Sequence, residues 1–236
     1  MPRQPLIRTD CFSYHVTNRS NNREWFYLPI DEVWRVFLAT LRGASERYQT
    51  EIHIFVLMSN HYHLILSTPQ RNLGEFMRYF QTEATREIQR RADRINHVFG
   101  TRYKWSVLEN PMAFSYAYKY VLRNPVRAGI CDGVDGYPYG SWALLEKSHW
   151  CLPHTERRDL LWSWIPKPFD ERLAWLNRRT PKEAEAMVQQ ALRRFRFEFS
   201  RGNDVRLAQD ALHEVYQWEP STRYLSGRKV DGHAEG

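Results

Sequence analysis

The sequence predicts an α+β fold, in which a ferredoxin-like antiparallel sheet carries helices on its face and a helical C-terminal extension follows. Three observations predict this fold. Short stretches alternate between apolar and polar residues, longer stretches repeat apolar residues at helical spacing, and the two kinds follow one another as strand, helix, strand, strand, helix, strand, helix. The chain has 236 residues with 42% hydrophobic and 26% charged side chains, which is typical of a globular protein and excludes a disordered one.

The first strand and the first helix are expected near the N-terminus. Residues 11–17 alternate as a strand does, and residues 18–23 form a polar turn that contains two arginines. Asp31 is expected to cap a helix that extends to about residue 48. The apolar face of this helix consists of Val33, Phe37, Leu41 and Ala44.

A hairpin and a long helix follow. Residues 52–58 and 61–67 are predicted strands, and Ser59-Asn60 is the short turn between them. Asn72 is expected to cap the long helix. Its inward face consists of Leu73, Phe76, Met77, Phe80, Ala84 and Ile88.

A fourth strand and a third helix complete the pattern. Residues 102–108 are predicted to be a strand, and Pro111 opens a helix that runs to about Arg123. The helix is expected to end before Asn124-Pro125, because proline disfavours helical geometry at the residue that precedes it.

The character of the sequence changes after residue 140. Thr180-Pro181-Lys182-Glu183 has the pattern of a capping box and predicts a helix to about Phe199, and a further helix is expected over residues 204–218. We therefore predict two parts, an α+β domain of residues 1–148 and a helical accessory region of residues 149–236 with a frayed tail.

The charge balance favours an anionic partner. Lys and Arg number 34 against 27 Asp and Glu, and 28 of the 34 cations are arginine, whose planar guanidinium suits phosphate. Charges on solvated faces would give the same composition. No apolar run is long enough to span a membrane, the N-terminal residues lack the apolar core of a secretory signal, and the three widely spaced cysteines suggest no disulfide framework. These features favour a cytoplasmic protein.

His61 and His63 are the first candidates for chemistry. Residues two apart on a strand point to the same face, so both imidazoles can approach one cation, while Tyr62 points toward the helices. Two strand histidines without a ligand would have the same spacing. His15, His53 and His97 stand alone in the sequence and are interpreted as structural or surface residues.

Tyr120 and Asn124 are the second pair of candidates. Four residues apart on a helix, they lie on one face, where an amide oxygen could ligate a hard cation and a phenol could reach a phosphate. Tyr120 could equally pack on the core while Asn124 ends the helix. Tyr118 is a competing nucleophile, but its helical position faces elsewhere.

These motifs resemble those of the single-tyrosine HUH transposases, most closely the REP-associated tyrosine transposases of bacterial chromosomes. The resemblance covers about the first 145 residues and follows the family's order. It rests on four stretches, which are Tyr14-His15-Val16-Thr17-Asn18-Arg19, Met58-Ser59-Asn60-His61-Tyr62-His63-Leu64, Tyr103-Lys104-Trp105 and the run from Tyr120 to Gly129, together with Tyr137-Pro138-Tyr139.

The resemblance implies a fold of the HUH endonuclease type and a role for each candidate. His61, His63 and Asn124 match the ligands of a divalent cation, Mg²⁺ or Mn²⁺, and Tyr120 matches the nucleophile. The implied function is a transposase that cuts and rejoins hairpin-associated single-stranded DNA, such as REP-like repeats, through a 5′-phosphotyrosine. The implied protein is a monomer or homodimer associated with the bacterial nucleoid.

The sequence departs from the family at three positions, since Tyr62 stands where an aliphatic residue is usual, Ser59 where proline is common and Ser20 where glycine is common. The expected phosphate and base contacts are Arg19, Arg23, Arg102, Lys104, Arg123 and Arg127, and each could also be a solvated surface residue.

Two other functions are compatible with the same sequence. A cleavage-inactive DNA-binding protein would bind hairpins without forming a covalent product. A metal-dependent phosphodiesterase would cut DNA with activated water and would not need Tyr120.

Overall fold

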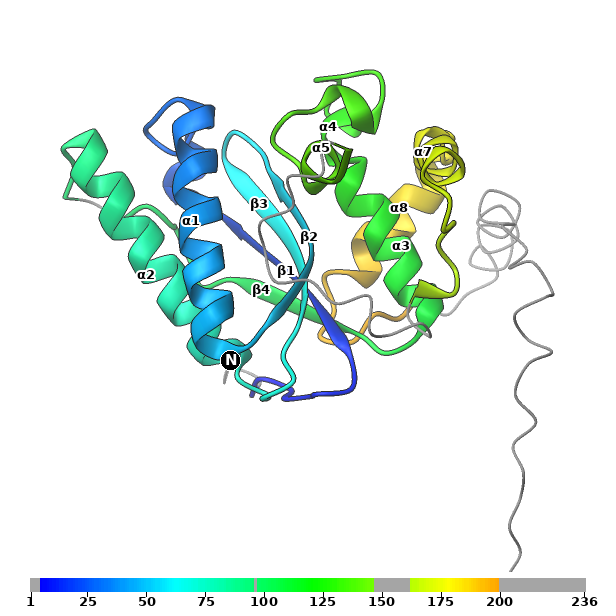
Figure 1. The fold of residues 1–236 in the computed structure, drawn as a ribbon, viewed down its shortest axis with the longest axis horizontal. Helices are drawn as coiled ribbons and strands as arrows, with labels where there is room; N and C mark the ends of the chain where they lie inside the picture. Colours follow the sequence, from blue (N-terminus) through cyan, green and yellow to red (C-terminus); the bar gives the residue numbers. More distant parts are fainter. Residues whose placement is uncertain (1–4, 96, 147–161, 200–236) are drawn as a thin grey trace, which may run out of the picture.

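A four-stranded antiparallel sheet lies at the centre of the structure, a computed structural model that describes residues 5–95, 97–146 and 162–199 (Figure 1). The strands are β1 (Ser13–Arg19), β2 (Glu51–Leu57), β3 (His61–Ser67) and β4 (Lys104–Leu108), in the order β2-β3-β1-β4. This order and the α+β composition confirm the predicted fold class.

The register of β3 decides which side chains reach each face of the sheet. β3 pairs with β1 so that His63 lies opposite Thr17 and His61 opposite Arg19. Because successive side chains on a strand alternate between faces, Tyr62 points away from the two histidines. The alternation predicted from the sequence is therefore confirmed.

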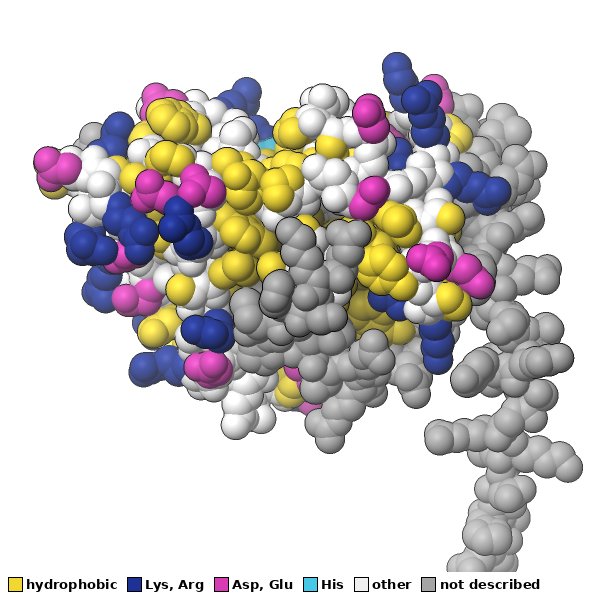
Figure 2. Space-filling model, turned by 45° about the horizontal axis from the view of Figure 1, so that its top comes forward, with side chains coloured by type: hydrophobic (Ala, Val, Ile, Leu, Met, Phe, Trp, Pro, Cys, Tyr) yellow, Lys and Arg dark blue, Asp and Glu magenta, His cyan; other side chains and the backbone are white. Residues whose placement is uncertain are grey.

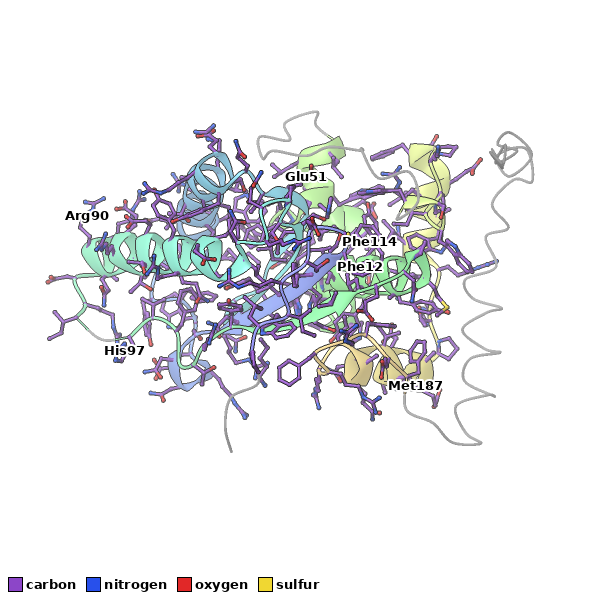
Figure 3. All side chains as sticks on the ribbon, turned by 90° about the horizontal axis from the view of Figure 1, so that it is seen from below. Phe12, Glu51, Arg90, His97, Phe114 and Met187 are labelled. Carbon is purple, nitrogen blue, oxygen red and sulfur yellow. The ribbon has the colours of Figure 1, made fainter. Side chains whose placement is uncertain are left out.

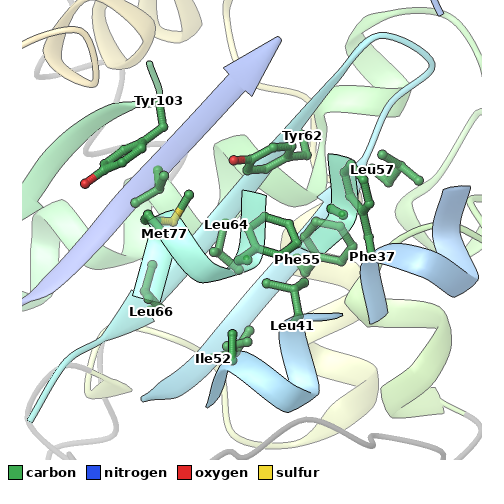
Figure 4. Packing of buried hydrophobic residues seen from close by; sticks show 14 of the residues in the cluster. Phe37, Leu41, Ile52, Phe55, Leu57, Tyr62, Leu64, Leu66, Met77 and Tyr103 are labelled. Atoms are coloured by element: carbon green, nitrogen blue, oxygen red, sulfur yellow. The ribbon is translucent and has the colours of Figure 1, made fainter. Parts of the chain in front are cut away.

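Helices α1 (Ile30–Tyr48) and α2 (Leu73–Ala92) cover the face to which Tyr62 points (Figure 1). Tyr62 is fully buried and packs edge-on against Phe37, beside Phe55 (Figure 4). Its hydroxyl accepts a hydrogen bond from Nε2 of Gln81 at 2.9 Å, so the departure from an aliphatic residue leaves no unpaired phenol in the core.

The other face of the sheet carries a second apolar cluster, formed with α3 (Pro111–Leu122), α5 (Ser141–Glu146), α7 (Phe169–Asn177) and α8 (Lys182–Ala191). α3 contacts β2, β3, β4 and α8. Figure 3 shows side chains filling the space on both sides of the sheet, with Phe114 on the α3 side.

α3 begins and ends where the sequence predicts. Oδ1 of Asn110 accepts a hydrogen bond from the Ala113 amide at 2.8 Å, and Pro111 occupies the first turn. The helix ends at Leu122, but the short helix α4 (Asn124–Arg127) follows directly, so the expectation that Pro125 keeps Asn124 out of helical geometry is wrong.

Some boundaries differ from the predictions. β1 begins at Ser13 rather than residue 11 and continues to Arg19. α1 is preceded by Pro29 in the capping position, so Asp31 lies in the first turn and is not the cap. Asn72 does precede α2, but its side chain donates to the carbonyl of Tyr48 at 2.9 Å and does not cap the helix.

The predicted helix to Phe199 is wrong in its second half. α8 ends at Ala191, its N-cap is Pro181, and no side-chain capping bond forms there, so the predicted capping box is absent. Residues 195–197 instead run beside β4, where the Val107 amide donates to Phe195 O at 2.9 Å and the Phe197 amide donates to Val107 O at 3.0 Å. The helix predicted over residues 204–218 lies outside the described residues.

Within the described ranges, no helix combines the length and apolar character needed to cross a membrane.

A lysine lies in the apolar layer between α3 and α7. Lys119 is fully buried, and its Nζ lies 5.1 Å from the centre of the Trp175 ring. Burial, with smaller contributions from Arg123 and Arg178, lowers the pKa of Lys119 to about 7. Since the unfolded chain holds this proton up to a pH near 10.5, folding is opposed by the Lys119 charge below pH 7, and that opposition is relieved as the pH rises to 10.5.

We predict that Lys119→Met removes part of the pH dependence of stability. Relative to the wild type, the variant should gain on the order of 1 kcal/mol or more in free energy of unfolding at pH 6, and the gain should shrink toward pH 10. Chemical denaturation at several pH values measures it, with exposed Lys182→Met as the control. A difference that does not change with pH would contradict the prediction.

Candidate active site

His61, His63, Tyr120 and Asn124 line one pocket of about 760 Å³. The rings of His61 and His63 are 5.2 Å apart between centroids, and the ring of Tyr120 lies edge-on to His63 at 5.9 Å. The histidines come from β3, whereas Tyr120 comes from α3, which packs on the same face of the sheet. The two motifs singled out in the sequence are therefore neighbours in space.

Both candidate histidine ligands are held in the neutral form. Burial and the positive charge of Arg19 lower the pKa of His61 to about 4, and burial followed by the neighbouring His15 lowers the pKa of His63 well below its usual value. Nδ1 of His61 lies 2.8 Å from Oδ1 of Asn60, which can only accept, so Nδ1 carries the proton and Nε2 carries the lone pair.

His15 belongs to the same pocket, although the sequence analysis interpreted it as a structural or surface residue. Its Nε2 lies 2.9 Å from Nδ1 of His63, and the two rings stack at 5.2 Å. Only the pairing of β1 with β3 brings these residues together, and no local pattern predicts it. The other two lone histidines fit the interpretation, since His53 is buried against Ser67 and His97 is exposed beyond the end of α2 (Figure 3).

Tyr120 and Asn124 are joined at the end of α3. Nδ2 of Asn124 donates to the carbonyl oxygen of Tyr120 at 3.3 Å. Among the described residues, no hydrogen bond engages Oδ1 of Asn124, so this oxygen can serve a cation. Tyr118 is buried on another side of α3 between Trp162 and Trp175, as the helical spacing predicts.

The donor atoms suit a hard cation only if an amide takes part. No group of three His, Cys, Asp or Glu side chains within the described part of the chain could hold a metal ion. Two neutral imidazoles and a carboxamide oxygen form a set that Mg²⁺ or Mn²⁺ can use together with oxygen atoms from a substrate. The residues present therefore fit a divalent cation.

The pocket is positively charged. Arg19, Arg23 and Lys104, three of the expected DNA contacts, line it together with Arg193, which follows the end of α8. No Asp or Glu is among the described residues that line it. The α1–α2 side of the molecule differs, because basic and acidic side chains are mixed on its surface (Figure 2), as in the pair of Arg86 with Glu83.

Three other predicted DNA contacts do not line the pocket. Arg102 is exposed and lies against the ring of Tyr103. Arg123 is buried and donates to the carbonyl of Leu176 at 2.8 Å, so it faces α7 and α8 and is not available at the surface. Arg127 is partly buried, and its guanidinium lies over the ring of Tyr120 at 4.7 Å.

Glu185 of α8 pairs with two of these arginines, Arg123 and Arg127, and Arg127 in turn contacts Tyr120. Its Oε2 accepts a hydrogen bond from Nε of Arg127 at 2.9 Å, and its Oε1 lies 3.8 Å from Nε of Arg123. Both ion pairs are largely shielded from solvent. Glu185 therefore ties α8 to the end of α3 and fixes the guanidinium that stacks on Tyr120.

Comparison with known proteins finds a family model that matches part of the chain. Residues 9–124 match the family described as "Transposase IS200 like". No curated protein matches the chain.

Two solved structures are similar. The structure of a REP-associated tyrosine transposase bound to a REP hairpin has a TM-score of 0.54 and 15% sequence identity, and covers 64% of this chain and 88% of that one. At this identity the likeness shows the fold. A transposase structure from Deinococcus radiodurans R1 has 17% identity and a TM-score of 0.34 over 44% of this chain and 82% of that one, which is too low to support an argument.

We predict that Glu185→Gln weakens the attachment of α8. The buried guanidinium of Arg123 would lose its counter-charge, and the free energy of unfolding should fall by on the order of 2 kcal/mol. Thermal unfolding measures the loss. Glu183→Gln, an exposed residue of the same helix, is the control and should be close to neutral. Equal effects of the two substitutions would show that the ion pairs contribute nothing.

Proposed function

We propose, on the premise that residues 9–124 belong to the IS200-like transposase family, that this transposase cuts and rejoins single-stranded DNA through a covalent bond to Tyr120. The sequence motifs and the family match both indicate a transposase in this part of the chain. The proposal adds the chemistry, the nucleophile and the DNA substrate.

One observation supports the proposal above the others. Tyr120 and the His61/His63 pair are separated by more than fifty residues in the sequence, yet they line one pocket, and the Tyr120 ring lies 5.9 Å from that of His63. A nucleophile and a phosphate-activating centre must be neighbours for an in-line displacement. Tyrosines packed only for stability, such as Tyr118, lie away from the pocket.

In the proposed reaction the Tyr120 oxygen attacks the scissile phosphorus. A bond forms between this oxygen and phosphorus, the bond from phosphorus to the 3′ oxygen breaks, and the products are a 5′-phosphotyrosine and a free 3′ hydroxyl. The phenol gives up one proton in this step and the departing 3′ oxygen takes one up to become the hydroxyl, so the number of protons is conserved. Because the phosphodiester energy is kept in the covalent bond, a 3′ hydroxyl can reverse the reaction and rejoin the strand.

The metal ligands in this proposal are Nε2 of His61, a ring nitrogen of His63 and Oδ1 of Asn124. A divalent cation, Mg²⁺ or Mn²⁺, would polarise the phosphate there. Both histidines are neutral at pH 7, as ligands must be.

Hairpin DNA is the proposed substrate. The pocket contains Arg19, Arg23, Lys104 and Arg193 and, among the described residues, no carboxylate, which favours a polyanion. The solved structure of similar fold is described as bound to a REP hairpin. We further propose that residues 1–148 carry out the chemistry and that residues 149–236 assist, since Gln189 of α8 and Arg193, just after this helix, line the pocket.

We predict that Tyr120→Phe abolishes covalent attachment to DNA. The wild type and the variant would be incubated with Mn²⁺ or Mg²⁺ and with 5′- or 3′-labelled hairpin oligonucleotides that carry randomised flanking sequence. The wild type should form a protein-linked product carrying the 3′-labelled fragment, seen on a denaturing gel. Tyr118→Phe, on the same helix but buried elsewhere, should retain this product.

Other outcomes of this assay separate the alternative functions. Cleavage without a protein-linked product, unchanged in Tyr120→Phe, would indicate a phosphodiesterase that uses water. Binding without cleavage under every metal condition would indicate a cleavage-inactive binding protein.

We predict that hairpin binding by Tyr120→Phe depends steeply on salt. Four phosphate contacts would lower affinity about 50-fold between 50 and 200 mM salt, since each contact in single-stranded DNA contributes a slope of about −0.7. Arg193→Gln should reduce the slope by about 0.7, whereas Arg86→Gln, paired with Glu83 on α2, should leave it unchanged. Fluorescence anisotropy measures both, and a flat salt response would contradict the proposed contacts.

A further inference from the structure

His15 is a buried residue of β1 that contacts the candidate metal ligand His63. It is 2% exposed, and its Nε2 lies 2.9 Å from Nδ1 of His63 with the rings 19° from parallel. Thr17 is the direct cross-strand neighbour of His63, so His15 reaches it diagonally across the β1–β3 pair. The contact is therefore a hydrogen bond between two imidazoles on the face of the sheet below Tyr120.

Such a bond couples the two tautomers. A hydrogen bond between ring nitrogens needs one N–H and one lone pair. If Nδ1 of His63 donates to His15, Nε2 of His63 keeps its lone pair and can ligate a cation. If Nε2 of His15 donates instead, the neutral His63 carries its proton on Nε2 and cannot ligate through that atom.

We propose that His15 is a positioning residue, which accepts the Nδ1 proton of His63 and so presents Nε2 of His63 to a divalent cation, an inference that rests on the proposed metal site. Histidine ligands in metal sites donate their second ring N–H to an acceptor that fixes tautomer and ring orientation. Asn60 does this for His61, with Oδ1 at 2.8 Å from Nδ1. His15 is the corresponding acceptor for His63.

The chain offers a matched control on the same sheet. His53 of β2 is also buried, 2% exposed, and its Nε2 lies 2.8 Å from Oγ of Ser67. That nitrogen bonds Ser67 and none of the three candidate ligands, and His53 is not among the residues that line the pocket. A substitution of His53 perturbs the interior of the sheet without touching His63.

Binding of Mn²⁺ alone to the full-length protein, measured by isothermal titration calorimetry, tests the inference. His15→Leu removes the acceptor and should weaken Mn²⁺ binding about 10–100-fold. His15→Gln places a carboxamide oxygen near the position of Nε2 and should restore most of the affinity. His53→Leu should bind Mn²⁺ as the wild type does.

His63→Ala separates failure of this inference from failure of the proposed site. If His63→Ala binds Mn²⁺ as tightly as the wild type, the proposed metal site is wrong. If His63→Ala loses binding while His15→Leu retains it, only the positioning role is wrong. Equal weakening by His15→Leu and His15→Gln also overturns the role, because the effect would then come from packing.

If the His15→Leu variant fails to fold, a spectroscopic measurement on the wild type still tests the inference. The ¹⁵N chemical shifts of the His63 ring in the Mg²⁺-loaded wild type report which nitrogen carries the proton. A protonated Nδ1 is the expected result. An unprotonated Nδ1 would overturn the inference whatever the variants do.

Discussion

The two-residue alternation of β3, fixed by its register against β1 and β2, is the constraint on which the rest of the structure depends. It places Tyr62 in the apolar layer under α1 and α2 and turns His61 and His63 toward α3. A shift of one residue would bury two imidazoles among phenylalanines and expose a phenol beside the pocket. The bond from Gln81 to Tyr62 and the diagonal contact from His15 to His63 both require the observed register.

The second face of the sheet combines an apolar cluster with polar groups, and this mixture is what makes a site possible there. α3 brings Tyr120 to the histidines because its remaining surface packs against β2, β4 and α8. Glu185 and Phe197 come from far along the chain, yet they hold the end of α3 and the edge of β4. The geometry around Tyr120 therefore depends on residues on both sides of the predicted boundary at 148, whichever of them touches a substrate.

The sequence was sufficient for features set by local periodicity and insufficient for those set by tertiary contact. The hairpin, the order of the elements, the inward direction of Tyr62 and the direction of Tyr118 away from Tyr120 follow from spacing alone. Arg123 was expected at the surface. Because α3 ends just before this residue, the helical pattern does not determine where its side chain points. Contact with the Leu176 carbonyl of α7 determines it instead. The end of α8 did have a local signal, because Phe195, Phe197 and Phe199 alternate with charged residues at the period of a strand, and Phe195 and Phe197 flank the pairing with β4.

The distribution of charge supports the proposed phosphate substrate. Two neutral imidazoles and an amide would leave the full double charge of a cation in place, whereas carboxylate ligands would cancel part of it. The described wall of the pocket adds arginine and lysine and contains no acidic side chain. Acidic residues are instead paired with arginines on α1 and α2, or with the arginines behind Tyr120. This separation of acidic residues from the pocket keeps the pocket attractive to an anion, and in the proposed site His63 must be neutral because a protonated imidazole cannot be a ligand.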